Sequence, residues 1–132
     1  MKRLLLFAAL LCAVTFAMGS SFISNASKTG QKQRASMTFN EPVKLQGVML
    51  KGAYLFVHDN DAMMRGEACT FVYKGNVETS KNLVASFHCT PANRTRVSNF
   101  TVRTAEPSPG VAELREFQFA GETESHLVPP AK

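Results

Sequence analysis

Hydrophobic and polar residues alternate in short runs from about residue 35 onward, a pattern typical of β-strands with one buried face. Glycine, proline and small polar residues separate the runs, as expected for tight turns. The segments most typical of strands are 36–40, 43–45, 48–50, 53–58, 69–74, 83–90, 98–104 and 112–119. They predict an all-β fold, a small antiparallel sandwich or barrel of about seven short strands.

The connections in this pattern are predicted from their turn residues. Gln46–Gly47 and Lys51–Gly52 each place a glycine between apolar runs and are predicted as turns. Residues 58–65 (HDNDAMMR) are polar and fit a loop or a single helical turn. The last apolar segment, 112–119, has large side chains at both helical and strand spacing, and we interpret it as a strand.

Residues 1–19 have the parts of a secretory signal peptide, and we expect them to form a signal helix. Lys2 and Arg3 supply the positive start, residues 4–16 are almost wholly apolar, and small residues precede a cleavage site after Gly19. The apolar run is shorter than the roughly 20 residues that a helix needs to cross a bilayer, which disfavours a retained anchor. We therefore predict an exported protein, periplasmic or extracellular.

Signal cleavage would leave about 113 residues, enough for one domain with a single core. Residues 20–34 are polar and lack periodicity, so they are predicted to be a flexible leader. The single β domain is expected over 35–128 and a short tail over 129–132. No second apolar run is long enough for a membrane span after cleavage.

The charge balance bears on the kind of partner. The chain has 15 Lys and Arg against 10 Asp and Glu, a formal net charge of +5. Loss of Lys2 and Arg3 with the signal leaves 13 against 10, a net charge of +3. Nucleic-acid-binding proteins concentrate far more positive charge on one surface. We expect no nucleic-acid partner, and instead an envelope or extracellular component.

Two cysteines remain in the predicted mature chain, Cys69 and Cys89, and such a pair in an exported domain usually forms a disulfide. An antiparallel register that pairs them also pairs Phe71 with Phe87 and gathers the aromatic side chains on one face. Closing this loop of about 20 residues would stabilise the fold by about 3 kcal/mol. Two free, buried thiols are the alternative interpretation.

Three histidines, His58, His88 and His126, could supply ligands to copper or zinc in an exported protein. None of them stands at i, i+2 or i, i+4 from another, so three distant segments would have to converge on one ion. This spacing favours surface or loop histidines. We accordingly predict no cofactor and no metal, and keep a periplasmic copper- or zinc-handling protein as the alternative.

Two catalytic interpretations are incomplete. His88 and Cys89 are neighbours, so on a strand their side chains point to opposite faces and cannot share a proton. Glu122, Glu124 and His126 alternate and would line one face of a strand, which suggests an acid–base hydrolase as a further alternative. A domain this small leaves little room for a substrate cleft. No catalytic residue is assigned, and the protein is expected not to be an enzyme.

The segment 42–56 (PVKLQGVMLKGAYLF) resembles a hairpin found in small exported bacterial β-domain proteins of unassigned function. The segments 66–73 (GEACTFVY) and 86–91 (SFHCTP) are similar to a branch of that group with two cysteines. The resemblance implies an exported β domain and transfers no catalytic residue. Together with the residues above, it predicts a non-enzymatic β module with a structural or binding role in the cell envelope or outside the cell.

Overall fold

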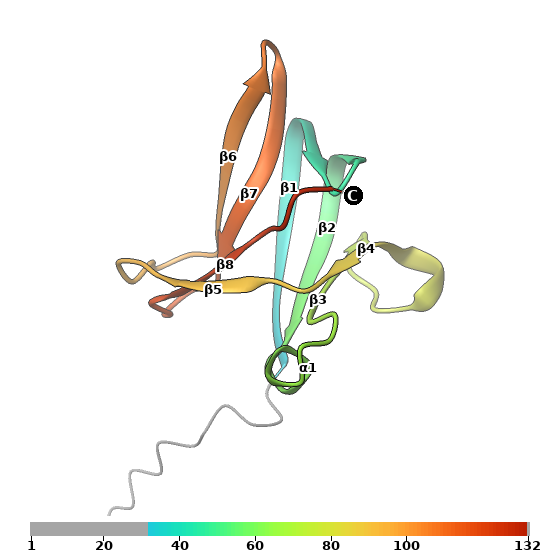
Figure 1. Cartoon of the computed structure of the whole chain (residues 1–132). Helices are drawn as coiled ribbons and strands as arrows, with labels where there is room; N and C mark the ends of the chain where they lie inside the picture. Colours follow the sequence, from blue (N-terminus) through green and yellow to red (C-terminus); the bar gives the residue numbers. More distant parts are fainter. Residues whose placement is uncertain (1–31, 132) are drawn as a thin grey trace, which may run out of the picture.

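The computed structural model describes residues 32–131 and shows a mostly-β protein (Figure 1). The predicted signal peptide and most of the predicted leader lie outside the described residues. Eight strands form one sheet: β1 (Lys32–Leu45), β2 (Val48–Asp59), β3 (Thr70–Lys74), β4 (Leu83–Phe87), β5 (Thr90–Asn93), β6 (Thr101–Ser108), β7 (Val111–Gln118) and β8 (Glu124–Leu127). Two short helices complete the described chain, α1 (Asn60–Met64) and a 3-10 turn at Ser80–Asn82. Neither is long and apolar enough to cross a membrane.

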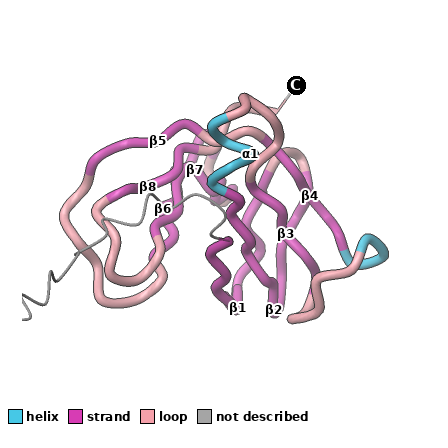
Figure 2. Tube along the Cα trace, turned by 90° about the horizontal axis from the view of Figure 1, so that it is seen from below, coloured by secondary structure: helices cyan, strands magenta, loops and turns pink. Residues whose placement is uncertain are grey.

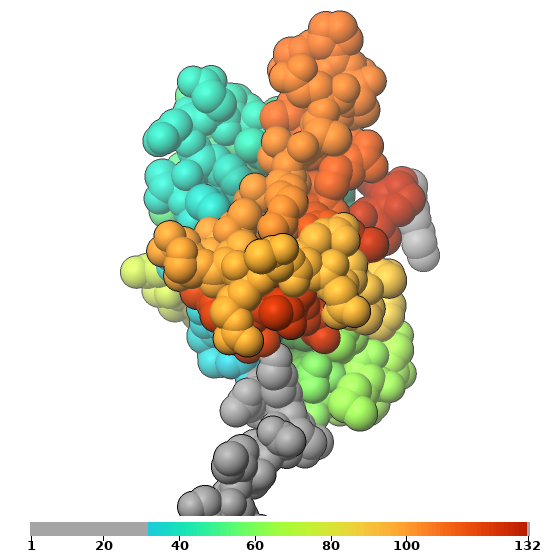
Figure 3. Space-filling model, turned by 90° about the vertical axis from the view of Figure 1, so that its left-hand side faces the viewer, coloured from blue at the N-terminus to red at the C-terminus, as the bar shows by residue number. Residues whose placement is uncertain are grey.

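The sheet is mixed and curled into a half-barrel, which corrects the predicted antiparallel sandwich or closed barrel (Figure 2). Its strand order is β4-β3-β2-β1-β7-β8-β5, with β6 paired to β7. All neighbours are antiparallel except β1 and β7, which run parallel through Val43–Lys44 and Ala112–Glu113. The hairpin of β6 and β7 protrudes from the body of the molecule (Figure 3). A single parallel junction therefore joins two antiparallel groups of strands into one sheet.

The β1–β2 hairpin is the longest unit of the sheet and begins at Lys32, before the boundary at Ala35 that we expected. The predicted turn at Gln46–Gly47 is confirmed, with both residues at positive φ. The predicted turn at Lys51–Gly52 is wrong, because β2 runs through it. Gly52, at φ +92°, lies opposite the irregular stretch of β1 that follows Phe39, so the glycine accommodates a bulge rather than a chain reversal.

The main core fills the concave side of the half-barrel and is rich in phenylalanine. Phe56 of β2 lies 5.7 Å from Phe117 and 5.2 Å from Phe100, measured between ring centroids. A smaller cluster of Leu55, Val57, Tyr73 and the partly buried Phe71 packs on the other face of β2 and β3. The buried members of the main core are Phe39, Val43, Leu45, Leu50, Tyr54, Phe56, Ala62, Cys69, Val72, Phe87, Cys89, Leu114, Phe117 and Phe119.

The segment 112–119 is a strand, as predicted, and a bulge explains its mixed spacing. Its pairing with β6 shifts between Leu114 and Glu116, so Arg115 has no direct partner on β6. The extra residue reverses the alternation of side chains along β7. Leu114 and Phe117 therefore both reach the core although three positions separate them.

The predicted register of β3 and β4 is wrong by one residue. Phe71 pairs with Ser86 and Thr70 pairs with Phe87, whereas we expected Phe71 opposite Phe87. A slip of one residue moves a side chain to the other face, so Phe87 lies in the main core and Phe71 in the smaller cluster. The predicted strand 83–90 is also divided, since β4 ends at Phe87 and β5 begins at Thr90.

Candidate metal centre

Helix α1 lies at the end of the half-barrel, next to the ends of β2 and β3 (Figure 1). The helix follows β2 directly, and the Asp59 carboxylate accepts a hydrogen bond from the Ala62 backbone N–H at 3.1 Å. This N-cap starts the helix directly after β2, so that α1 lies above the pair of His58 on β2 and Thr70 on β3. Ala62 is buried and Met63 packs against the core, so the inner side of α1 forms a lid over the sulfur atoms described next.

His58 enters this site because of its position on β2. It shares the inner face of the strand with Tyr54 and Phe56 and pairs with Thr70 of β3. The imidazole is only 1% exposed, and neither ring nitrogen has a hydrogen-bond partner. The Thr70 hydroxyl is likewise buried without a partner. An unsatisfied buried polar group costs about 1–3 kcal/mol, so a histidine in this state calls for an explanation.

Cys69 and Cys89 lie beside this imidazole and are both free thiols with no exposed surface. Their sulfur atoms are 3.0 Å apart, and the Cys89 N–H donates to the Cys69 sulfur at 3.2 Å. Cys89 stands after the end of β4, where the chain turns towards β5, so it reaches Cys69 without being its cross-strand partner. The predicted disulfide is not formed in the structure and stays a prediction.

The two thiols differ in acidity. The hydrogen bond from Cys89, together with the interaction with His58, lowers the pKa of Cys69 to about 4 although burial opposes this. The same hydrogen bond, reinforced by burial, raises the pKa of Cys89. Cys69 is therefore the more acidic of the two thiols, and the hydrogen bond from Cys89 is the main cause. A thiolate is the form of cysteine that binds metals and acts as a nucleophile.

His126 reaches the same cluster from β8. It pairs with Phe117 across the sheet, and this places its ring in the core, 1% exposed and stacked on Phe117 at 5.1 Å. Its Nδ1 lies 3.5 Å from the Cys89 sulfur, and its ring centroid lies 4.1 Å from that of His58. Its Nε2 lies 3.9 Å from the Glu124 carboxylate. Histidines that bind metals are commonly oriented by such a carboxylate on the second nitrogen.

His88 lies on the outer side of the sulfur pair and is exposed. Its Nδ1 is 3.9 Å from the Cys69 sulfur and 2.9 Å from the Glu67 carbonyl oxygen. The expectation that the histidines lie on the surface therefore holds for His88 and is wrong for His58 and His126. The structure does bring segments around all three histidines together, with the cysteines between them.

The alternating set proposed for a hydrolase does not form one exposed face. The His126 ring is buried, whereas the Glu122 and Glu124 side chains are partly exposed. The Glu122 carboxylate accepts from the Gln33 amide at 3.3 Å. An acid–base pair working on a substrate would need the imidazole at the surface, so this geometry does not favour the hydrolase.

The ligand atoms of His58, Cys69 and Cys89 all lie within 4.8 Å of one another. The Met63 sulfur adds a soft donor 3.9 Å from the Cys89 sulfur. Thiolate and imidazole are donors for both zinc and copper(I), and a thioether is a further donor for copper(I). The sequence interpretation missed this group because it assigned the two cysteines to each other. The signal that could have found it is the position of His58, two residues after Phe56 on an otherwise apolar strand face.

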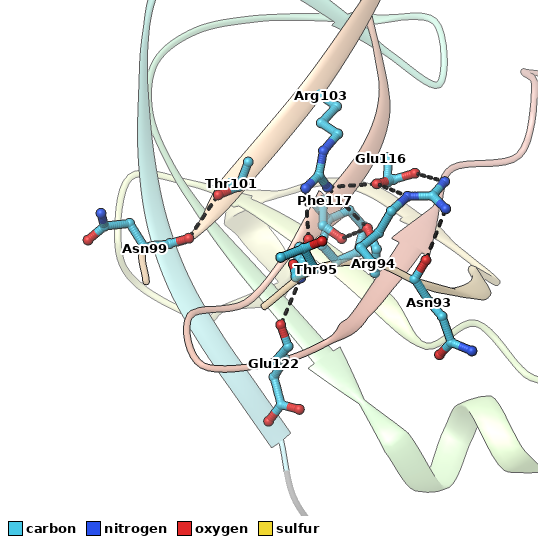
Figure 4. A network of polar contacts seen from close by, with 11 residues as sticks. Asn93, Arg94, Thr95, Asn99, Thr101, Arg103, Glu116, Phe117 and Glu122 are labelled. Atoms are coloured by element: carbon cyan, nitrogen blue, oxygen red, sulfur yellow. Dashed lines mark hydrogen bonds and ion pairs between the residues drawn. The ribbon is translucent and has the colours of Figure 1, made fainter. Parts of the chain in front are cut away.

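A second buried polar cluster lies on the opposite side of β7 (Figure 4). The Glu116 carboxylate is held by Arg94 at 2.7 Å and by Arg103 at 2.6 Å. Arg103 also donates to the Gln118 side-chain oxygen at 2.8 Å. The Gln118 amide donates to the backbone carbonyls of Thr95 and Glu122. Each of these side chains has its partners, so this cluster is a structural support for the β5–β8 end of the sheet.

Comparison with protein-family models, with curated proteins and with solved structures found no match to this chain. The resemblance of segment 42–56 to small exported bacterial proteins stays a prediction. Any function must therefore be argued from the geometry of the site itself.

Proposed function

We propose that this protein is an exported, non-enzymatic β module that binds a thiophilic metal ion, zinc or copper(I), through His58, Cys69 and Cys89. The observation that carries the proposal is the buried His58 imidazole without a hydrogen-bond partner beside two free thiols whose sulfurs are 3.0 Å apart. A metal ion would use the lone pair that the fold leaves unused, and its positive charge would replace the proton held between the sulfurs.

The distances support this assignment. Ligands of a tetrahedral zinc site at about 2.3 Å from the ion lie roughly 3.7 Å from one another. The sulfurs are 3.0 Å apart and all three ligand atoms fit within 4.8 Å, so an ion needs only a small opening of the sulfur pair. His126 and Met63 each lie within 4 Å of the Cys89 sulfur. His126 would complete a zinc site, and Met63 would favour copper(I), because thioethers bind copper(I) and not zinc.

The metal test uses the full-length expressed protein, purified under reducing conditions and loaded separately with zinc and with copper(I). We expect one ion per chain for at least one of them, measured by elemental analysis after removal of loose metal. Cys69→Ser and His58→Leu should each weaken competition against a chelator by about 10–100-fold or more. Thr70→Val is the matched control. It replaces a buried hydroxyl beside the ligands that has no hydrogen-bond partner and is not a soft donor, so metal affinity should not change. A wild-type protein that holds neither ion would end the proposal.

Oxidation of the same two sulfurs to the predicted disulfide is the competing role of the pair. A disulfide removes both thiolate ligands, so the two states exclude each other. Intact mass with and without alkylation distinguishes them, because the disulfide form lacks two hydrogens and resists alkylation. Protein that is disulfide-bonded as secreted, and that binds no metal after reduction, would have the purely structural role.

A further inference from the structure

We infer that the surface pocket lined by His88 is the entry port of the metal site, with the His88 imidazole as the first ligand of an incoming ion. This inference rests on the proposed function. The pocket has a volume of about 680 Å³ and lies between the end of β4 and the C-terminal segment after β8. Ser86 and His88 line one side of it, and residues 129–131 line the other.

The wall formed by the C-terminal segment is fixed to the body of the protein. The Gln46 amide donates a hydrogen bond to the Pro129 carbonyl oxygen. The Val128 N–H donates to the Arg115 carbonyl oxygen at 2.8 Å. These contacts come from the β1–β2 hairpin and from β7, so two separate parts of the sheet hold the wall in place. The pocket is thus a built feature of the fold.

His88 connects this pocket to the buried sulfurs. It is exposed, whereas His58, Cys69 and Cys89 have at most 1% of their surface accessible, so an ion from solvent cannot meet those ligands first. The Glu67 carbonyl oxygen lies 2.9 Å from Nδ1 and can only accept, so Nδ1 carries the ring proton. Nε2 is therefore the ring nitrogen left for a metal. The Nδ1 edge of the same ring is 3.9 Å from the Cys69 sulfur.

Transfer would proceed by ligand exchange without any change of oxidation state. A bond between the ion and its donor breaks as a bond to the His88 nitrogen forms. The ring then turns, because Nδ1 and not Nε2 faces the Cys69 sulfur, and the bond to His88 breaks as that sulfur binds. Each thiol that binds the ion releases its proton to water. An imidazole is intermediate in softness between water and thiolate, which suits a ligand that must bind an ion and then release it.

Helix α1 offers the competing route. Met64 is 74% exposed and follows Met63, whose sulfur lies 3.9 Å from the Cys89 sulfur. An ion could in principle pass along these thioethers instead. The pocket is favoured because Met63 and Ala62 pack the inner side of α1 against the core, whereas His88 stands in an open cavity.

The experiment measures the rate of metal capture from a coloured zinc or copper(I) chelate by stopped flow, alongside the equilibrium affinity. His88→Ala should slow capture about tenfold or more while leaving the affinity within about twofold. Ser86→Trp, which leaves His88 in place and narrows the pocket, should slow capture in the same way. Met64→Leu is the matched control on the other route and should capture at the wild-type rate.

The outcomes separate the two proposals. Wild-type capture rates in both His88→Ala and Ser86→Trp would overturn the entry port and leave the metal site intact. Slow capture in Met64→Leu would assign the route to α1 and also overturn it. A matching loss of affinity in His88→Ala would make His88 a permanent ligand rather than an entry ligand. Failure of the wild-type chain to bind either ion would instead contradict the proposed function.

Discussion

Two buried polar clusters lie on opposite faces of β7 and differ in how their hydrogen bonds are satisfied. On one face Glu116, Gln118 and two arginines form a closed network (Figure 4). On the other, His58 and Thr70 have unpartnered polar atoms beside two thiols. Both clusters remove polar groups from water, which is costly unless partners replace the water.

This difference indicates which cluster has a function beyond stability. The Glu116 cluster has its partners within the chain, so nothing further is needed to explain it. The His58 cluster keeps two ring nitrogens without partners beside two free thiols, and the proposed metal ion would satisfy them. Unsatisfied buried groups in native proteins are few, and they concentrate where function requires them.

The largest expected effect is metal-induced stabilisation at the open cluster. Zinc or copper(I) at about 1,000 times its dissociation constant should raise the free energy of unfolding by up to about 4 kcal/mol, because the folded state holds the ligands together. Binding of the ion to cysteines of the unfolded chain reduces this gain. Urea denaturation with and without metal measures this. The double variant Cys69→Ser, Cys89→Ser should show no gain. A gain that survives in the double variant would place the ion elsewhere.

Breaking the closed cluster should have the next largest effect. Glu116→Ala leaves Arg94 and Arg103 facing each other without the carboxylate that holds them. We expect a loss of about 2–3 kcal/mol in the free energy of unfolding, reduced by the partial exposure of both arginines. Chemical denaturation of the metal-free protein measures it. Metal affinity should be unchanged, and a parallel loss of affinity would show that the clusters are coupled.

The same apolar substitution should have opposite signs in the two clusters. His58→Leu removes a buried ring whose nitrogens lack hydrogen-bond partners and should stabilise the metal-free protein by up to about 1 kcal/mol. The lost interaction with Cys69 offsets part of this gain. Gln118→Leu is the matched change in the closed cluster and should destabilise by about 1–2 kcal/mol, since it leaves the Thr95 and Glu122 carbonyls unpaired. Thermal unfolding compares the two. Destabilisation by both would mean that His58 is satisfied in solution.

The smallest effect concerns the acid side of the stability profile. The hydrogen bond from Arg94 lowers the pKa of Glu116 below its ordinary value of 4.5, against the effect of burial. A carboxyl whose pKa is lowered on folding stabilises the protein above its unfolded pKa. This stabilisation is lost as the pH falls from about 4.5 through the folded pKa. The stability difference between wild type and Glu116→Gln should therefore shrink over this range in pH-dependent unfolding, and a constant difference would contradict the assignment.

Local patterns in the sequence were sufficient for the type of most elements. The glycine at 47 specified a turn that the structure confirms. The polar run 58–65 predicted a loop or a single helical turn, and the structure has the helical turn, α1. The β-branched and aromatic composition of 53–58 and 69–74 predicted β2 and β3. Turns and strands of this kind depend on the conformational preferences of residues that are neighbours in the chain, so they can be predicted from the sequence.

The pairing register of the strands, and whether a strand continues past a glycine, were not determined by local sequence patterns. Gly52 suggests a turn by itself, but pairing with the irregular stretch of β1 after Phe39 carries β2 through it. The predicted register of β3 and β4 is wrong by one residue because it placed the two cysteines opposite each other as cross-strand partners. The chain instead turns after Phe87, which brings Cys89 to Cys69 from outside the ladder.

A β domain with turns at identifiable positions and two cysteines able to meet follows from the local residue patterns alone. The surroundings of those cysteines depend on how the strands pack. His58 on β2 and His126 on β8 are far apart in the chain, and curling of one mixed sheet brings their rings to within 4.1 Å of each other. The physical reason is that the register of a strand determines on which face of the sheet each side chain lies. The register between strands distant in sequence depends on the packing of the whole core.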